Sequence, residues 1–133
     1  MNLARDVAAD VTFLGNVYGE TKLELLRHAT AVAFASLREG QPIAMLEAMA
    51  ANVPVLAPTG MCSDYAVDNV TAWIYEAGDS VALCRRILGV HSESEQLRKE
   101  ITSNARAHVE KTNHPDIVAI KHEELYFKCT AAN

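Results

Sequence analysis

The chain has 133 residues, of which half are hydrophobic and 22% are charged, and its net charge is −5. This is the length of one domain with one hydrophobic core, and the acidic balance gives no general attraction to nucleic acid or to anionic lipid. No apolar run approaches the roughly 18 residues that indicate a membrane span, so we expect none. The three cysteines, Cys62, Cys84 and Cys129, fit neither a zinc pattern nor a disulfide framework, which makes a reducing cytoplasm the expected location.

Four short apolar runs, bounded by turn residues, predict strands at residues 11–14, 31–35, 53–57 and 72–75. Apolar residues at helical spacing predict helices over residues 20–29 and 43–51, and we expect residues 64–68 to form a short helix or turn. Asp79 is expected to cap a further helix, and residues 94–111 and 115–128 complete a helical C-terminal tail. Continuously apolar strands that alternate with helices predict an α/β fold, in which a parallel sheet of about four strands has helices on both faces.

The segment from Glu39 to residue 51 is the most informative part of the chain. Gly40 supplies a bendable backbone, and Pro42 suits the start of a helix because its missing N–H is not needed there. From residue 43 to residue 51, every residue except Glu47 is Ala, Leu, Ile or Met. A carboxylate is costly to bury without a partner, so Glu47 lies on the rim of the fold or has a polar partner.

Both carboxylates emerge at the edge of the sheet where parallel strands end. Glu39 lies in the loop after the strand at residues 31–35, and Glu47 lies in the helix that this loop begins. Ligands of such sheets bind in the crevice beyond the carboxyl ends of the strands. The start of the helix presents free backbone N–H groups and a positive dipole end, which favour an anion such as a diphosphate.

Four short motifs that follow one another along the chain support a ligand site at this edge. They are Ala35-Ser36, Glu39-Gly40, Glu47-Ala48-Met49-Ala50 and Pro54-Val55. The combination resembles the signature of the retaining, nucleotide-sugar-dependent glycosyltransferases of family 4, which have the GT-B architecture of two facing Rossmann-like domains. The resemblance covers roughly residues 11–127 and implies that residues 1–133 are a single domain, a truncated C-terminal Rossmann-like domain of such an enzyme.

The resemblance also implies roles for individual residues. Glu39 would contact hydroxyls of the donor sugar, as the catalytic-site carboxylate, and Glu47 would accept hydrogen bonds from the ribose hydroxyls. The sugar and phosphates would be lined by Gly40, Gln41 and Ile43, and Val17 and Tyr18 lie in the turn that would contact the nucleobase. Ser36 is either a hydroxyl on the phosphate side or a cap at the end of a strand. For Glu39, Glu47 and Tyr18 the alternative is an ordinary solvated side chain.

The donor would be a UDP- or GDP-linked sugar, with no cofactor. The sequence has no Asp-x-Asp motif, and we expect no metal site. Two positions depart from the family pattern. Met61 stands where a small residue is usual, which would narrow or reshape the site, and Asn69 stands where the family has a glycine. Asn tolerates a positive φ angle, so Asn69 can replace that glycine in a turn.

The resemblance implies two partners that this sequence lacks, the N-terminal acceptor domain and the first two strands with their diphosphate-binding cations. We therefore expect no sugar transfer by this chain alone. Without those strands the run at residues 31–35 would keep an unpaired edge, which predicts a homodimer unless residues 11–14 pair with that edge directly. The leading hypothesis is the donor-binding part of a larger glycosyltransferase. The alternative is a stand-alone, non-catalytic module that binds a nucleotide sugar or a protein.

Overall fold

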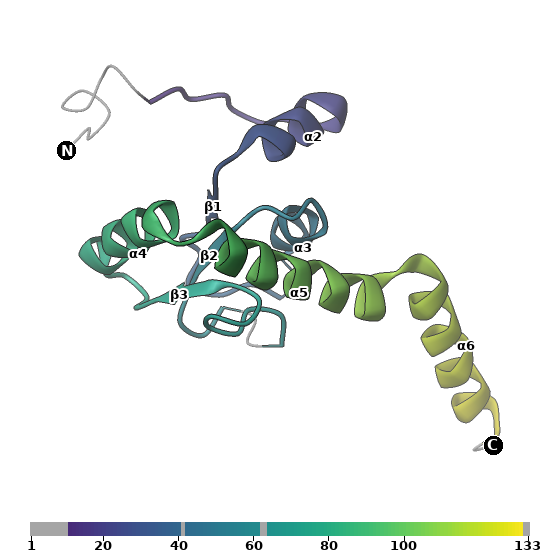
Figure 1. Cartoon of the computed structure of the whole chain (residues 1–133). Helices are drawn as coiled ribbons and strands as arrows, with labels where there is room; N and C mark the ends of the chain where they lie inside the picture. Colours follow the sequence, from purple (N-terminus) through teal and green to yellow (C-terminus); the bar gives the residue numbers. More distant parts are fainter. Residues whose placement is uncertain (1–10, 41, 62–63, 132–133) are drawn as a thin grey trace.

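The computed structural model describes residues 11–40, 42–61 and 64–131. These residues form a three-stranded parallel sheet and five helices (Figure 1). In chain order the elements are α2 (Gly19–His28), β1 (Val32–Ala33), α3 (Ile43–Ala50), β2 (Val55–Pro58), β3 (Trp73–Tyr75), α4 (Ser80–Ser92), α5 (Glu95–Asn113) and α6 (Pro115–Ala131). The predicted fold class, an α/β fold with a parallel sheet and a helical C-terminal tail, is confirmed.

The sheet has the order β1-β2-β3, with Val32 opposite Val55 and Leu56 opposite Trp73. Side chains alternate between the two faces of a strand, so Val55 and Ala57 belong to one buried cluster and Leu56 to another. Both faces of β2 are therefore buried. This explains why its sequence is continuously apolar.

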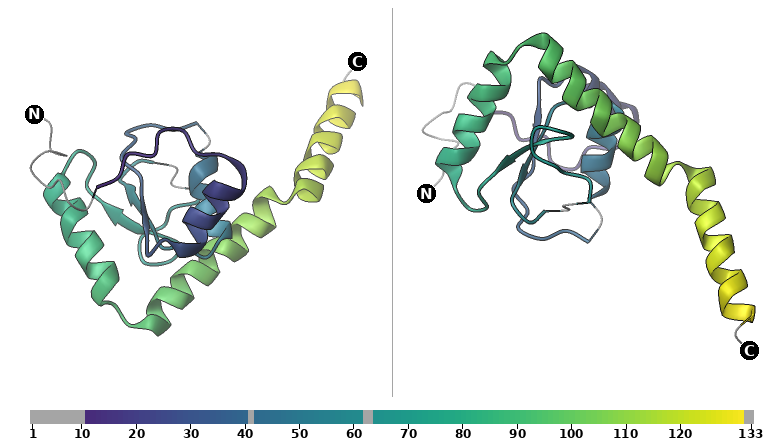
Figure 2. Two further views of the ribbon diagram at one scale, coloured as in Figure 1. Left: turned by 90° about the horizontal axis from the view of Figure 1, so that it is seen from above. Right: turned by 60° about the horizontal axis from the view of Figure 1, so that its bottom comes forward.

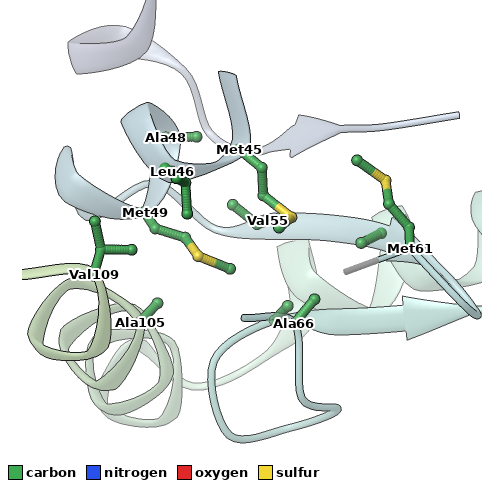
Figure 3. Close-up of a cluster of buried hydrophobic side chains, with 11 residues drawn as sticks. Met45, Leu46, Ala48, Met49, Val55, Met61, Ala66, Ala105 and Val109 are labelled. Carbon is green, nitrogen blue, oxygen red and sulfur yellow. The ribbon is translucent and has the colours of Figure 1, made fainter. Parts of the chain in front are cut away.

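Helices cover both faces of the sheet, as predicted. The first cluster combines side chains of α3, β2 and α5 and includes Met45, Met49 and Val109 (Figure 3). The second cluster lies on the opposite face and brings Val90 of α4 and Ile101 of α5 against Leu56 and Trp73. Because α5 contributes to both clusters, it closes one end of the sheet as well as covering a face.

The helix starts that the sequence predicted for α4 and α5 are confirmed. The Asp79 side chain accepts hydrogen bonds from the backbone N–H groups of Val81 and Ala82, both at 2.9 Å. The Ser94 hydroxyl accepts one from the N–H of Leu97 at 3.2 Å. Each cap satisfies backbone donors that have no acceptor within the helix.

The predicted strand at residues 11–14 is wrong. This segment pairs with no strand among the described residues, and its side chains are exposed, that of Phe13 to 80%. A four-residue apolar run has no hydrogen-bond partners of its own, and it becomes a strand only where a neighbouring strand supplies them. The direct pairing of residues 11–14 with β1 that we considered is likewise not formed. β1 has one strand neighbour within the described chain, β2, and it is shorter than the predicted run at residues 31–35.

The turn between β2 and β3 confirms the expectation for Asn69, which has a φ of 55°. The Thr71 hydroxyl donates to the backbone carbonyl of Tyr65 at 2.6 Å and accepts from the N–H of Val67 at 2.9 Å. Arg86 of α4 donates to both carboxylate oxygens of Asp68, at 3.0 and 2.8 Å. These bonds fix the turn although it has little regular structure.

The two outer helices are held more loosely than α3, α4 and α5. α2 has no buried residue, although Leu26 packs against the first cluster. α6 follows α5 and projects away from the body of the molecule (Figure 2). Its large apolar side chains are exposed, with Tyr126 at 67% and Phe127 at 68%. Among the described residues, no helix combines the length and the apolar character needed to cross a membrane.

Candidate functional site

The three parallel strands end at one edge of the sheet, and the loops that follow them meet there. β1 ends at Ala33 and β3 at Tyr75. The loop after β1 carries Ser36, Glu39 and Gly40 and leads into α3. Glu39 and Gly40 are exposed and Ser36 is half-buried. The structure thus puts these three predicted residues at the edge where α/β proteins bind ligands.

The start of α3 is open to this edge. Pro42 is its N-cap residue, with no hydrogen bond from a capping side chain. The Pro42 carbonyl accepts from the N–H groups of Met45 and Leu46, at 2.9 and 3.1 Å. The N–H groups of Ile43 and Ala44 in the first turn have no acceptor within the helix. They carry the positive end of the helix dipole, and the Ile43 side chain beside them is exposed.

Glu47 lies one turn further into α3, on the face away from the first cluster. Its side chain is 33% exposed and forms an ion pair with Lys22 of α2, whose Nζ lies 2.6 Å from Oε1 of Glu47. Both readings of the lone carboxylate therefore hold, because Glu47 lies on the rim of the fold and also has a polar partner.

Lys22 was missed by the sequence reasoning. Lys22 lies in α2, 25 positions before Glu47. The other basic residues of α2 are equally plausible partners for Glu47 from the sequence. No local pattern distinguishes it from those residues.

Val17 and Tyr18 directly precede α2. Val17 is half-buried, and Tyr18, the N-cap residue of α2, is 74% exposed. The Lys22–Glu47 pair joins the first half of α2, which follows this turn, to the solvent side of α3. Gln41, the remaining predicted site residue, lies outside the described residues.

Two cavities adjoin these residues. One, of about 180 Å³, lies at the carboxyl edge between the ends of β1 and β3 and the start of α4, where it is lined by Ala35, Leu37, Tyr75 and Asp79. The other, of about 430 Å³, runs between α2, α3 and α5 and includes Glu47, Arg27 and Arg106 in its lining. Glu39 lines neither of these two cavities. The predicted site residues are therefore not gathered in one of these cavities, because Glu47 lines the larger cavity and Glu39 lines neither.

Tyr75 stiffens the carboxyl edge. Its hydroxyl donates to the backbone carbonyl of Phe34 at 2.5 Å, which joins the end of β3 to the residue after β1. Burial of the phenol raises the pKa of Tyr75 above its ordinary value, because the charged phenolate loses its hydration. A neutral Tyr75 is therefore a fixed donor in the wall of the smaller cavity.

Met61, which stands where a small residue is usual in the family pattern, lies in the core. Its side chain is 2% exposed and belongs to the first cluster with Met45, Val55 and Ala57 (Figure 3). An unbranched, flexible thioether side chain fills irregular space in a core, which explains how it replaces a small residue here. No group of three or more potential metal ligands occurs in the described ranges.

The family model of the glycosyl transferases group 1 matches residues 1–108. No curated protein sequence matches the chain.

Several solved structures share the fold. A sucrose-phosphate synthase from Thermosynechococcus elongatus is 22% identical, with a TM-score of 0.86 over 98% of this chain and 33% of its own. The C-terminal domain of a glycosyl transferase group 1 family protein from Francisella tularensis is 23% identical, with a TM-score of 0.69 over 84% of this chain and 58% of its own. Anabaena HepE, solved with UDP and glucose, is 23% identical, with a TM-score of 0.76 over 96% of this chain and 34% of its own. The chain thus spans about a third of the synthase and of HepE.

Proposed function

The chain belongs to the group 1 glycosyl transferases, and from that membership we propose that it is the donor-binding part of a larger glycosyltransferase. The proposed architecture is GT-B, with this chain as the C-terminal Rossmann-like domain. The proposed reaction transfers a sugar from a UDP- or GDP-linked donor with retention of configuration, as in family 4, without a metal ion. One observation carries the proposal. Glu39 lies in the loop at the carboxyl edge that leads into α3, and Glu47 lies one turn into that helix, on its solvent side.

The roles of the two carboxylates follow from their chemistry. An ionised carboxylate has two acceptor oxygens, and a pair of neighbouring hydroxyls is a matching pair of donors. We assign the donor-sugar hydroxyls to Glu39, which is exposed in the loop before α3, and the ribose hydroxyls to Glu47. The diphosphate between ribose and sugar then faces the first turn of α3, where backbone N–H groups favour an anion.

The remaining predicted residues line the same ligand. Gly40, Gln41 and Ile43 would border the sugar and the phosphates, and Ser36 would face the phosphates. The turn of Val17 and Tyr18 would contact the nucleobase, and the exposed Tyr18 ring offers a surface on which a base can stack. The structure of Anabaena HepE with UDP and glucose supports a UDP-linked donor, since that protein has this fold.

Catalysis would require cations that neutralise the departing diphosphate. Near the two carboxylates the described chain offers Lys22, which is paired with Glu47, and the exposed Arg38. Arg27 and Arg106 line the same cavity as Glu47, but each is paired with a glutamate of its own helix. We therefore propose that the diphosphate-binding cations and the acceptor site belong to the remainder of a longer protein. Positioning of the acceptor and stabilisation of charge supply most of the rate, so this chain alone would bind donor without transferring sugar.

We further propose that the chain forms a homodimer through the outer edge of β1 and that it resides in the cytoplasm. The outer edge of β1 has no strand partner within the described residues, and such edges pair readily with a second chain. Cys84 and Cys129 are free and exposed, which fits a reducing compartment. Light scattering at micromolar concentration tests the dimer. A mass near twice 14.5 kDa is expected, and a mass near 14.5 kDa would exclude it.

The donor proposal is tested by titrating the chain with UDP, GDP, UDP-glucose and GDP-mannose in a calorimeter. We expect one nucleotide series to bind, with the sugar-linked form tighter than the bare nucleotide. Glu39→Ala should remove the advantage of the sugar-linked form and leave the affinity for the bare nucleotide unchanged. A chain that binds none of the four compounds would contradict the proposal, and an unchanged advantage in Glu39→Ala would remove Glu39 from the sugar site.

A further inference from the structure

The ion pair between Lys22 and Glu47 differs from the other charge contacts of α2. Lys22 Nζ lies 2.6 Å from Glu47 Oε1, and the two residues belong to different helices and are 25 positions apart in the chain. The other described ion pairs of α2 are internal to it, between Arg27 and Glu20, Arg27 and Glu24, and His28 and Glu24. Lys22 is thus the charged residue through which α2 is linked to α3.

This link matters because α2 is otherwise weakly anchored. None of its residues is buried, and Leu26 is the side chain that packs against the first cluster. With Leu26 as its one side chain packed against the first cluster, α2 could still rotate about that contact. A second contact is therefore needed to fix the orientation of α2 on α3. Lys22 is in the first half of α2, close to the turn with Val17 and Tyr18, so the pair holds this end of α2 against α3.

The pair also fixes the Glu47 carboxylate. A glutamate on a helix surface has three rotatable side-chain bonds, and fixing such a side chain costs up to about 2 kcal/mol of conformational entropy. The bond from Lys22 engages Oε1 before any ligand arrives. A carboxylate has about four acceptor positions on its two oxygens, so one bond from lysine leaves sufficient capacity for two neighbouring hydroxyls.

We propose that Lys22 is a positioning residue for the nucleotide, which orients the Glu47 carboxylate toward the ribose diol through the contact between Nζ and Oε1. The inference rests on the proposed function, in which Glu47 receives the ribose hydroxyls. It goes beyond that function by assigning the selectivity for a ribose with both hydroxyls to a pair of residues, Lys22 and Glu47, rather than to Glu47 alone.

The experiment compares two ligands and three variants of the whole chain by calorimetry. The ligands are UDP and 2′,3′-dideoxy-UDP, which lacks the diol. The variants are Lys22→Ala, Lys22→Arg and Lys99→Ala, the last a matched control that removes a lysine paired with Glu95 on α5. Lys22→Ala should weaken UDP binding on the order of two- to fivefold, the range for a partly exposed ion pair. It should leave dideoxy-UDP binding unchanged. Lys22→Arg should restore UDP affinity, and Lys99→Ala should resemble the parent.

The outcomes separate this inference from the function on which it rests. If Lys22→Ala weakens both ligands equally, Lys22 has a structural role only and the inference is overturned. Equal or tighter UDP binding by Lys22→Ala also overturns it, because lysine would then be irrelevant or would compete with the ribose. If the parent binds GDP instead of UDP, the guanosine ligands replace the uridine ones. If the parent binds neither nucleotide, the proposed function itself fails.

Discussion

Replacing Glu93 by alanine should destabilise the sheet that carries the site. The Trp73 side chain is 1% exposed in the second cluster, and its indole N–H donates to Oε2 of Glu93 at 2.8 Å. Glu93 is the C-cap residue of α4, so this bond joins β3 to the end of that helix. Glu93→Ala leaves a buried donor without its acceptor, which costs about 1–3 kcal/mol. Because Glu93 is half-buried and water can reach its position, we expect about 1–2 kcal/mol.

For a chain of this length, that loss lowers the melting temperature by about 4–7 °C. The assay is thermal unfolding followed by circular dichroism at one fixed protein concentration, because association would make the midpoint depend on concentration. Glu93→Gln keeps an acceptor oxygen and should lose less than half as much. Glu100→Ala, which removes an exposed carboxylate from α5, serves as the control for charge. If Glu93→Ala melts like Glu100→Ala, or if Glu93→Gln is as destabilised as Glu93→Ala, the reasoning is wrong.

Two further predictions concern the core and the carboxyl edge. Met49→Ala removes a fully buried side chain from the first cluster. It should lower the free energy of unfolding in urea by about 2–5 kcal/mol, and a loss below 1 kcal/mol would mean that the cluster closes around the cavity. Tyr75→Phe removes the bond to Phe34 and should cost about 1 kcal/mol at neutral pH. Burial raises the pKa of Tyr75 in the folded state. The contribution of the neutral Tyr75 side chain to the free energy of unfolding is therefore complete below pH 10, and it is lost as the pH rises through the folded pKa. The stability of the parent should therefore fall more steeply above pH 10 than that of Tyr75→Phe, and parallel curves would contradict this.

The parts of the fold that the sequence predicted well depend on local signals. Asp79 caps α4, as expected, because a capping side chain bonds to backbone groups two or three residues away. The helix predicted from Ser94 onward also forms, with Ser94 as its N-cap residue. Asn69 takes the positive φ angle that the turn requires. The apolar run in β2 predicts a strand buried on both faces, and the structure confirms it.

The parts that were missed depend on contacts between distant residues. Whether residues 11–14 form a strand is decided by a neighbouring strand, which no local pattern encodes. The position of Met61 in the core, and the bonds from Lys22 to Glu47 and from Trp73 to Glu93, join segments that only the folded chain brings together. At the candidate site, the sequence predicted that Glu39 lies in the loop before α3 and that Glu47 lies within this helix. It gave no indication of the lysine that meets one of them.

The central claim is that Glu47 governs nucleotide binding, and calorimetric titration of Glu47→Gln tests it most directly. Replacing a charged acceptor by a neutral amide weakens bonds that contribute about 1.5–3 kcal/mol, which corresponds to about a tenfold or greater loss of affinity for UDP or GDP. Glu95→Gln, which alters a carboxylate paired with Lys99, is the matched control and should bind like the parent. Loss of a partly exposed ion pair costs at most about 1 kcal/mol, so Glu47→Gln should melt within a few degrees of the parent. A Glu47→Gln chain that binds the nucleotide as tightly as the parent and Glu95→Gln would contradict the account.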